Sequence, residues 1–408
     1  MATINIILLF LCLIWSYYKT KDIFHPYVIF CGIWFTLLFL YQAYPHVLYP
    51  LTDDFQLTML LWILSFSLFP VVSLAYGKCN HPCVNISELA NHNYVSDNRK
   101  EELLYKYCLI FALIHIIILI VTGAFSGNYY EKLVHESHEK SIIETLFDYC
   151  QKIPIVFCGY LFLIKRGQMK KEKTILALLI SIAMILMAVK TRLIQFLLMS
   201  LFLSNIGKRV RLRTLAILAI SVFVFFTAIQ LFRIQDQERK DNFEVSEFFM
   251  HYVLAPLPSM DYVMHDKSEQ LKGRTFRFFN TILVKMKLKE PEKNKRITGA
   301  NDGWVFVPIA NNVYTTLYNV WMDYNNTGII IYGIIVGLFW ITIYRRALYG
   351  KLVFALFYGA ILYALVLQFF DDIILSYTSD IIQFYFWSWL IFKMLKKDGR
   401  YTLSNVQR

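Results

Sequence analysis

The sequence predicts an all-α polytopic membrane protein with about eleven transmembrane helices, and three observations favour this fold class. Of the 408 residues, 57% are hydrophobic and only 17% are charged, with a mean hydropathy of +0.47. A soluble protein covers its surface with more polar groups than this. The apolar residues also gather in runs long enough to cross ~30 Å of hydrocarbon. Because these runs lack the period-two alternation of a membrane β-barrel, α-helices remain as the spanning element.

The apolar runs divide the chain into three regions. Transmembrane helices one to eight are expected in 1–232, a large polar loop in 233–327, and the last three helices with a C-terminal tail in 328–408. The runs themselves are residues 2–18, 26–44, 56–77, 104–124, 143–164, 173–189, 192–206, 213–232, 328–344, 352–370 and 381–395. The first run lacks a basic segment before it and a small-residue cleavage site, so it indicates a retained helix rather than a signal peptide.

Lysine and arginine are concentrated on alternate loops, which predicts the sidedness of the chain. The basic loops include residues 19–21, 78–106, 165–173, 208–213, 345–351 and 393–400. The loops between them, such as 44–55 and 371–380, contain few basic residues. The positive-inside rule therefore places the N-terminus and 233–327 outside, and the C-terminus in the cytoplasm. The net charge of +12 then reflects topology, so we expect the lipid bilayer and no nucleic acid as a partner.

Two groups of possible metal ligands are weak signals. Cys79, His81 and Cys83 lie in one cytoplasmic loop, but genuine zinc sites show paired spacing with a clear fourth ligand. His135 and His138 lie in an outer loop among glutamates, a pattern typical of a solvated segment. The sequence therefore predicts no metal and no other cofactor.

One connection on the expected outer side is basic, although the positive-inside rule predicts few basic residues there. Lys190, Thr191 and Arg192 form the whole link between two apolar runs at that surface. A cation at a membrane end often extends its charge to the interface without further function. An anionic ligand would equally explain basic residues here. The sequence leaves these two interpretations of Arg192 open.

The large outer loop carries further cations. Arg233, directly after the eighth run, is placed where a guanidinium can clamp a phosphate with two hydrogen bonds. Arg239 follows it, and Arg274 and Arg277 lie in the middle of the loop. The later run 285–296 alternates lysines with glutamates, which indicates a solvated surface.

Aromatic residues cluster at the end of this loop. Tyr314, Tyr318 and Trp321 follow a spacing of i, i+4 and i+7, which would place them on one face of a helix. Such a face is typical of the aromatic belt at a membrane interface. With Asn312 and Asp323 near by, it could also form a platform that binds sugars.

The same segment resembles a known family. It contains Asn312-Val-Tyr314-Thr-Thr-Leu317, then Asp323-Tyr324 four residues before Gly328, and then an apolar helix with an internal Gly337. This pattern resembles bacterial O-antigen polymerases of the Wzy type, and Lys190-Thr-Arg192 resembles the entry to one of their central helices. The chain has Asp-Tyr-Asn where Asp-Phe-Gly is commoner, and Lys190 where a small residue is usual. The resemblance covers the architecture of most of the chain, but residues only in 190–195 and 311–337.

The resemblance implies a GT-C-like glycosyltransferase of the bacterial inner membrane. Such an enzyme moves a growing glycan from undecaprenyl pyrophosphate onto a lipid-linked repeat unit in the periplasm, without a metal. Its implied partners are the undecaprenyl pyrophosphate-linked oligosaccharide, a chain-length regulator and a flippase.

The resemblance also implies site residues. Cations at the membrane face would stabilise the departing pyrophosphate, and a general base would activate the acceptor hydroxyl. The candidate catalytic residues are Arg192, Arg233, His251, Asp261 and Asp323, with His265 as a further candidate base. The candidate substrate-binding residues are Lys190, Arg239, Arg274, Arg277, Asn312, Tyr314, Tyr318, Trp321 and Tyr324.

Three other functions remain as alternatives. A flippase or other transporter would need polar residues within many helices, and internal repeats. An O-antigen ligase would share the outer-loop chemistry but use a different acceptor. A membrane acyltransferase would need a histidine within a helix, for which His115 is the candidate, although a lone histidine of this kind is usually structural.

Overall fold

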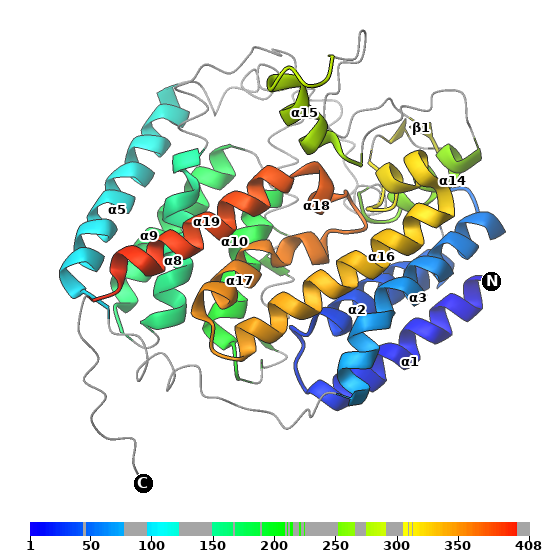
Figure 1. Ribbon diagram of the computed structural model, residues 1–408, viewed down its shortest axis with the longest axis horizontal. Coiled ribbons are helices and arrows are strands. Elements are labelled where there is room, and N and C mark those ends of the chain that lie inside the picture. The colour runs from blue at the N-terminus through cyan, green and yellow to red at the C-terminus, as the bar shows by residue number, and fades with distance from the viewer. Residues whose placement is uncertain are drawn as a thin grey trace.

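A computed structural model of the chain shows a bundle of helices (Figure 1). The structure describes residues 1–43, 46–76, 96–121, 149–165, 168–187, 190–208, 210, 213–214, 220–221, 224, 252–265, 275–290, 305–308, 310–311 and 313–397. The described helices are α1 (Ala2–Thr20), α2 (Pro26–Ala43), α3 (Asp53–Tyr76), α5 (Asn98–Val121), α8 (Lys152–Ile164), α9 (Lys170–Leu186), α10 (Lys190–Asn205), α14 (Pro256–His265), α15 (Arg277–Lys285), α16 (Tyr318–Leu348), α17 (Leu352–Val366), α18 (Ile373–Ser376) and α19 (Thr378–Leu395). Two short antiparallel strands, β1 (Val305–Phe306) and β2 (Ala310–Asn311), pair with each other.

Several helices have the length and apolar composition of membrane spans. Among the described residues, α1, α2, α3, α5 and α16 each satisfy both conditions, and α8 and α17 are shorter apolar helices. The fold class is therefore confirmed as an all-α membrane protein. Every expected apolar run except the eighth overlaps a described helix. The run 213–232 falls largely outside the described residues, so a total of eleven spans stays a prediction.

Contacts between distant segments agree with the expected grouping of loops. At one end of the bundle, the hydroxyl groups of Tyr344 and Tyr358 donate to the Asp22 carboxylate and the Phe24 carbonyl. At the other end, the backbone N–H of Thr316 donates to the Gln368 carbonyl over 2.7 Å. The contacts thus join segments expected on the same side, which we call the inner and the outer end. Which end faces the cytoplasm rests on the positive-inside rule.

Helices α3 and α16 pack closely because glycines let their backbones approach each other. A Cβ atom added to Gly333 would collide with the Ser65 hydroxyl, and one added to Gly337 with the Phe66 carbonyl oxygen. The internal glycine of the family pattern therefore has a packing role in this chain.

Helix α16 begins at Tyr318, before the apolar run 328–344 that was expected to form the membrane span. Its first turns are polar and aromatic, so an apolar run does not reveal them. A kink at Asn325, with φ of 51°, separates these turns from the longer apolar part. Next to the kink, Asn326 accepts a 2.8 Å hydrogen bond from the Thr58 hydroxyl of α3. The helix therefore begins within the segment that was expected to be the outer loop, and the boundary of that loop at 327 stays a prediction.

Part of the large outer loop is attached to the outer end of the bundle. Buried Asp261 of α14 accepts hydrogen bonds of 2.6 Å from both the backbone N–H and the hydroxyl of Thr52. Asn311 of β2 donates to the Ser259 hydroxyl over 2.7 Å. These contacts place α14 and the short hairpin above the ends of α2 and α3 (Figure 1).

Candidate functional site

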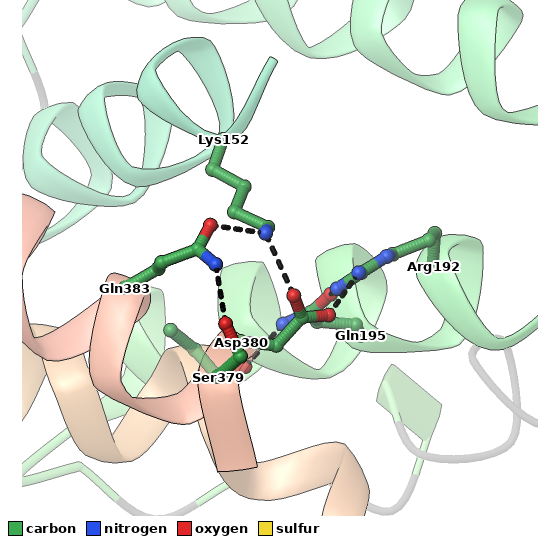
Figure 2. A network of polar contacts seen from close by, with 7 residues as sticks. Lys152, Arg192, Gln195, Ser379, Asp380 and Gln383 are labelled. Atoms are coloured by element: carbon green, nitrogen blue, oxygen red, sulfur yellow. Dashed lines mark hydrogen bonds and ion pairs between the residues drawn. The ribbon is translucent and has the colours of Figure 1, made fainter. Parts of the chain in front are cut away.

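A cluster of three charged side chains lies at the outer end, where three helices begin (Figure 2). Lys152 is the first residue of α8, Arg192 lies in the first turn of α10, and Asp380 lies in the first turn of α19. One Asp380 oxygen accepts a hydrogen bond from Lys152 Nζ at 2.7 Å, and the other forms an ion pair with Arg192 Nη2. The fold thereby joins residues that are far apart in the sequence.

Neutral side chains orient both cations. Gln195 accepts a 3.1 Å hydrogen bond from Arg192 Nη1 and donates from its own amide to the Ala360 carbonyl over 2.7 Å. Gln383 accepts from Lys152 at 2.5 Å and donates to the Ser379 hydroxyl at 3.0 Å. Each amide is itself hydrogen-bonded, so the two cations are held in defined positions rather than at the ends of free chains.

The electrostatics of the cluster suit the binding of an anion. Among the described residues, the two cations Lys152 and Arg192 pair with the same carboxylate, that of Asp380. The N-terminal ends of α8, α10 and α19 add partial positive charge at the same place. The side chains of Lys152 and Asp380 are 6% and 15% exposed, whereas that of Arg192 is 24% exposed. Arg192 is therefore the cation with the greatest access to a ligand.

The position of Arg192 bears on the two interpretations of its charge. An arginine that only reached the interface would direct its guanidinium away from the protein. Here the guanidinium points between the helices and pairs with Asp380 (Figure 2). The ion pair accounts for the orientation of Arg192 within the protein, and contact with an anion stays a prediction. Removal of Arg192 would deprive Asp380, which is mostly buried, of one ionic partner.

A small cavity adjoins the two cations. It measures about 40 Å³ and lies between α5, α8, α9 and α10. Lys152 and Arg192 form its polar part, and apolar residues such as Phe111 and Met184 form the rest, together with His115. The cationic cluster thus borders an apolar space within the bundle.

A second group of carboxylates lies between α17 and α18. Tyr332 donates a 2.8 Å hydrogen bond to Asp372, whose backbone N–H donates to the Asp371 carboxylate over 2.7 Å. Burial raises the pKa of Asp371 to about 6 and that of Asp372 to about 7. The sequence analysis did not select either residue.

Tyr377, between α18 and α19, lies close to both the Arg192–Asp380 ion pair and the carboxylate of Asp371. The charges of Asp371, Arg192, Asp380 and Arg277 all act on its hydroxyl. Arg277, the first residue of α15, also acts on Asp371. The structure therefore brings two predicted cations, Arg192 and Arg277, to one region of the outer end.

The other predicted carboxylates have structural partners. The Asp261 carboxylate accepts a hydrogen bond from the backbone N–H of Thr52, and Asp323 accepts a 2.8 Å hydrogen bond from the backbone N–H of Thr275. His265 lies 3.4 Å from Asp54, and its ring Nδ1 is 2.9 Å from the Asp261 carbonyl oxygen. That hydrogen bond to the Asp261 carbonyl is the main cause of a raised His265 pKa.

The predicted aromatic face is not an open platform. Tyr314, Tyr318 and Trp321 are 6%, 7% and 8% exposed, and the first two rings stack with centroids 4.3 Å apart. Because α16 begins at Tyr318, Tyr314 lies outside the helix and reaches the stack from the preceding segment. Tyr324 is 49% exposed and contacts the edge of Phe276, so it is the one of these four aromatic residues that is accessible.

Several predicted residues lie outside the described part of the chain. They are Arg233, Arg239, His251, Arg274 and Asn312, together with Cys79, His81, Cys83, His135 and His138. The side chain of Lys190 is likewise not described, although α10 begins at this residue. The expected convergence of Arg192 and Arg233 therefore stays a prediction.

Lys152, Asp371 and Asp380 were not among the residues predicted from the sequence. One signal for Lys152 was present, because a lysine in the middle of the apolar run 143–164 is unusual for a membrane span. Asp371 and Asp380 belong to the short outer connection that was noted only for its lack of basic residues. Acidic residues beside an apolar run could have been examined as partners for Arg192.

Neither similarity to known proteins nor a group of metal-ligand side chains assigns a function to the described part of the chain. No protein-family model matches the chain, and no curated protein or solved structure is significantly similar to it. Among the described residues, no group of three or more histidine, cysteine, aspartate or glutamate side chains could hold a metal ion. Function therefore has to be inferred from the site and from the family pattern in 311–337.

Proposed function

We propose that the protein is a membrane glycosyltransferase that polymerises lipid-linked oligosaccharide repeat units. The donor would be a glycan on undecaprenyl pyrophosphate, and the acceptor a new lipid-linked unit at the outer face of the bacterial inner membrane. One observation carries this proposal, namely that Lys152 and Arg192 meet at Asp380 where three helices begin. The family pattern around Tyr314 and Asp323 supports the choice of glycosyl transfer.

Binding of the donor pyrophosphate is the role that suits the cationic cluster. A pyrophosphate attached to a membrane lipid must lie near the membrane face, where α8, α10 and α19 begin. A guanidinium binds phosphate oxygens through two parallel hydrogen bonds, and an ammonium acts as a point charge beside it. Asp380 would hold both cations in place before the donor arrives, so that little reorganisation is needed during the reaction.

The transfer step requires one bond to form and one to break. The acceptor hydroxyl oxygen attacks the anomeric carbon, and the bond from that carbon to the pyrophosphate oxygen breaks. The electron pair leaves with the pyrophosphate, which gains negative charge as it departs. Fixed cations stabilise this developing charge, and the loss of one such group typically costs ~10²–10³ in rate.

A general base must accept the proton of the acceptor hydroxyl. Asp371 is our candidate, because it lies in the same region of the outer end as Arg192 and its pKa is raised to about 6. Asp261 and Asp323 are less suitable, since both accept hydrogen bonds from the backbone of other segments. Arg277 would keep part of the Asp371 population ionised.

The positions of the buried charges favour transfer at a surface over transport. Transporters bind substrates near the middle of the membrane, with polar groups inside their helices. In the described residues, Lys152, Arg192 and Asp380 lie at the outer end, and Glu101 and Lys165 at the inner end. We therefore favour the enzyme over the flippase.

Deletion of the gene, followed by analysis of surface polysaccharide length, tests the proposal. Loss of a polymerase should leave surface glycan with a single repeat unit, and the wild-type gene should restore long chains. A deletion strain that shows no surface glycan would contradict polymerisation and indicate a flippase or a ligase instead.

A biochemical experiment should accompany the deletion. The purified full-length protein in lipid nanodiscs is mixed with lipid-linked repeat units, and product length is measured by electrophoresis. The proposal expects polymers longer than two units from the wild-type protein and none from Arg192→Gln. An Arg345→Gln variant provides the control, because Arg345 is an exposed arginine at the inner end of α16.

A further inference from the structure

Helix α15 presents an unusual surface for a segment of a polar outer loop. None of its residues, all of which the structure describes, is buried. Phe276 and Phe279 are 49% and 54% exposed, and Met286 and Leu288, just after the helix, are 62% and 69% exposed. Large apolar side chains at this density cover an area that water solvates poorly.

The apolar residues of α15 share one side of the helix. Phe279, Leu283 and Met286 follow a spacing of i, i+4 and i+7, and Phe276 extends the series by one turn. Polar residues such as Asn280 and Thr281 lie away from this line. The helix is therefore amphipathic, with an apolar face that the rest of the described structure does not cover.

The other feature of this segment is its positive charge. Residues 275–290 contain Arg277, Lys285, Lys287 and Lys289 but only one acidic residue, Glu290. A cationic amphipathic helix with aromatic residues on its apolar face is the pattern of a helix that lies in a membrane interface. Anionic lipid headgroups complement its basic residues.

The location of α15 agrees with this pattern. Thr275, just before the helix, donates from its backbone N–H to Asp323 and from its hydroxyl to the Asn319 carbonyl. The helix also contacts α18, and it lies at the same end of the molecule as α14 and α18 (Figure 1). Below this attachment, α16 exposes Ile331 and Ile335, as expected of a lipid-facing surface.

We propose that residues 276–288 form an interfacial helix, whose apolar face enters the outer leaflet of the membrane while Lys285, Lys287 and Lys289 contact anionic headgroups. The occupant of the apolar face is thus the lipid bilayer. Burial of this face in the acyl region removes the apolar side chains from water, which is the driving force for such helices. The attachment at Thr275 keeps the helix close to Asp371 and Tyr377, because the positive charge of Arg277 affects both residues.

Fluorescent labelling of the full-length protein tests this placement. Cysteine is introduced by Leu283→Cys or, as a matched control, by Phe306→Cys, and labelled with the polarity-sensitive dye NBD. Phe306 is 63% exposed and belongs to β1 in the same outer loop, so it controls for exposure without an amphipathic helix. The unsubstituted chain, carried through the same reaction, gives the background from the native cysteines. The labelled proteins are placed in nanodiscs with and without lipids that carry a quenching nitroxide in the acyl chain.

The expected result is a blue-shifted emission at position 283 that nitroxide lipids quench, with unshifted and unquenched emission at position 306. If the label at 283 is not quenched by nitroxide lipids, the proposal is wrong, whether that label is exposed to water or covered by another protein surface. The readout is independent of catalysis, so it stands even if the proposed glycosyl transfer fails its own test.

The contribution of charge has a separate test. Quenching at position 283 should increase in nanodiscs that contain anionic phosphatidylglycerol, and the increase should disappear in about 0.5 M salt, where screening shortens electrostatic range to a few ångströms. Replacing Lys285, Lys287 and Lys289 with glutamine should abolish the same increase. A signal that is independent of anionic lipid would contradict recognition of headgroups by these lysines.

Discussion

The inner and outer ends of the bundle each contain a buried ion pair, and the two pairs place their lysines at opposite ends of α8. At the inner end, Lys165 of the α8 C-terminus pairs with Glu101 of α5 over 2.9 Å, and Glu101 also accepts a 2.5 Å hydrogen bond from Tyr160. A second buried lysine at this end, Lys173, donates to the Lys165 carbonyl oxygen over 2.6 Å. At the outer end, Lys152 and Arg192 share Asp380.

The orientation of the helices strengthens this difference. Lys165 follows the C-terminal end of α8, where a cation interacts favourably with the helix dipole. Lys152, at the other end of the same helix, is a cation at an N-terminus, where the dipole opposes it. The helix dipole therefore favours the cation at the inner end and opposes the cation at the outer end, where it would favour an anion. This contrast is our reason for placing function at the outer end.

The largest expected effect is on catalysis at the outer end. Arg192→Ala should lower the rate of polymer formation by ~10²–10³, because it removes a cation that stabilises the departing pyrophosphate. It should also reduce stability by about 1–3 kcal/mol, since Asp380 keeps only Lys152 as an ionic partner. Product electrophoresis gives the rate and thermal unfolding gives the stability.

Two variants separate these effects. Arg192→Lys keeps the charge but loses the planar fork, so it should restore stability more fully than rate. Arg345→Ala should leave both values unchanged. Normal polymer from Arg192→Ala would mean that the arginine serves only the fold.

The second prediction concerns the inner pair. Glu101→Gln should lower stability by about 3 kcal/mol, because Lys165 then lacks its carboxylate in a largely buried position. The rate per folded molecule should not change, because the inner end does not contact the substrate. Unfolding temperature and activity, measured on the same preparation, test the difference between the two ends. A rate loss comparable with that of Arg192→Ala would remove the distinction.

A third and smaller effect is the pH dependence of the reaction. If Asp371 is the base, the rate should fall about tenfold for each pH unit below a pKa of about 6, because the protonated carboxyl cannot accept a proton. Asp371→Asn should be inactive or nearly so at every pH. An unchanged pH profile in a partly active Asp371→Asn variant would assign the base to another residue.

The smallest expected effect is at His265, which joins α14 to Asp54. The pKa of His265 is raised above 6.5, mainly by its hydrogen bond to the Asp261 carbonyl, so its stabilising contribution is present below 6.5 and is lost as pH rises through the raised value. His265→Gln should therefore lower the unfolding temperature at about pH 6 but not at about pH 9. Because Asp54 is 77% exposed, the loss should not exceed about 1 kcal/mol. Equal destabilisation at both pH values would exclude an ionic contribution.

Local patterns in the sequence predicted the bundle well. Apolar runs located α1, α2 and α3 to within a few residues, and the alternation of basic loops grouped the segments that the contacts later joined. The apolar runs did not reveal the start of α16, because its first turns from Tyr318 to Tyr324 are polar and aromatic, although Tyr318 and Trp321 follow a helical spacing.

The candidate site was only partly predictable, for a physical reason. Arg192 could be selected from the sequence because the outer side was expected to contain few basic residues. Its partner Asp380 is 188 residues away, and Lys152 is 228 residues from the same carboxylate, so no spacing in the sequence relates them. The aromatic residues Tyr314 and Tyr318 matched a helical spacing, but burial closed the face that this spacing suggested.

The binding of the donor lipid is the most direct test of the role proposed for the Lys152–Arg192–Asp380 cluster at the outer end. The affinity of the full-length protein in nanodiscs for undecaprenyl pyrophosphate should be measured for the wild type, Arg192→Gln and Arg345→Gln. We expect Arg192→Gln to bind at least about tenfold more weakly, as each charge-assisted hydrogen bond contributes about 1.5–3 kcal/mol, and Arg345→Gln to bind like the wild type. Equal affinity for all three proteins would contradict the assignment of the Lys152–Arg192–Asp380 cluster as the pyrophosphate site.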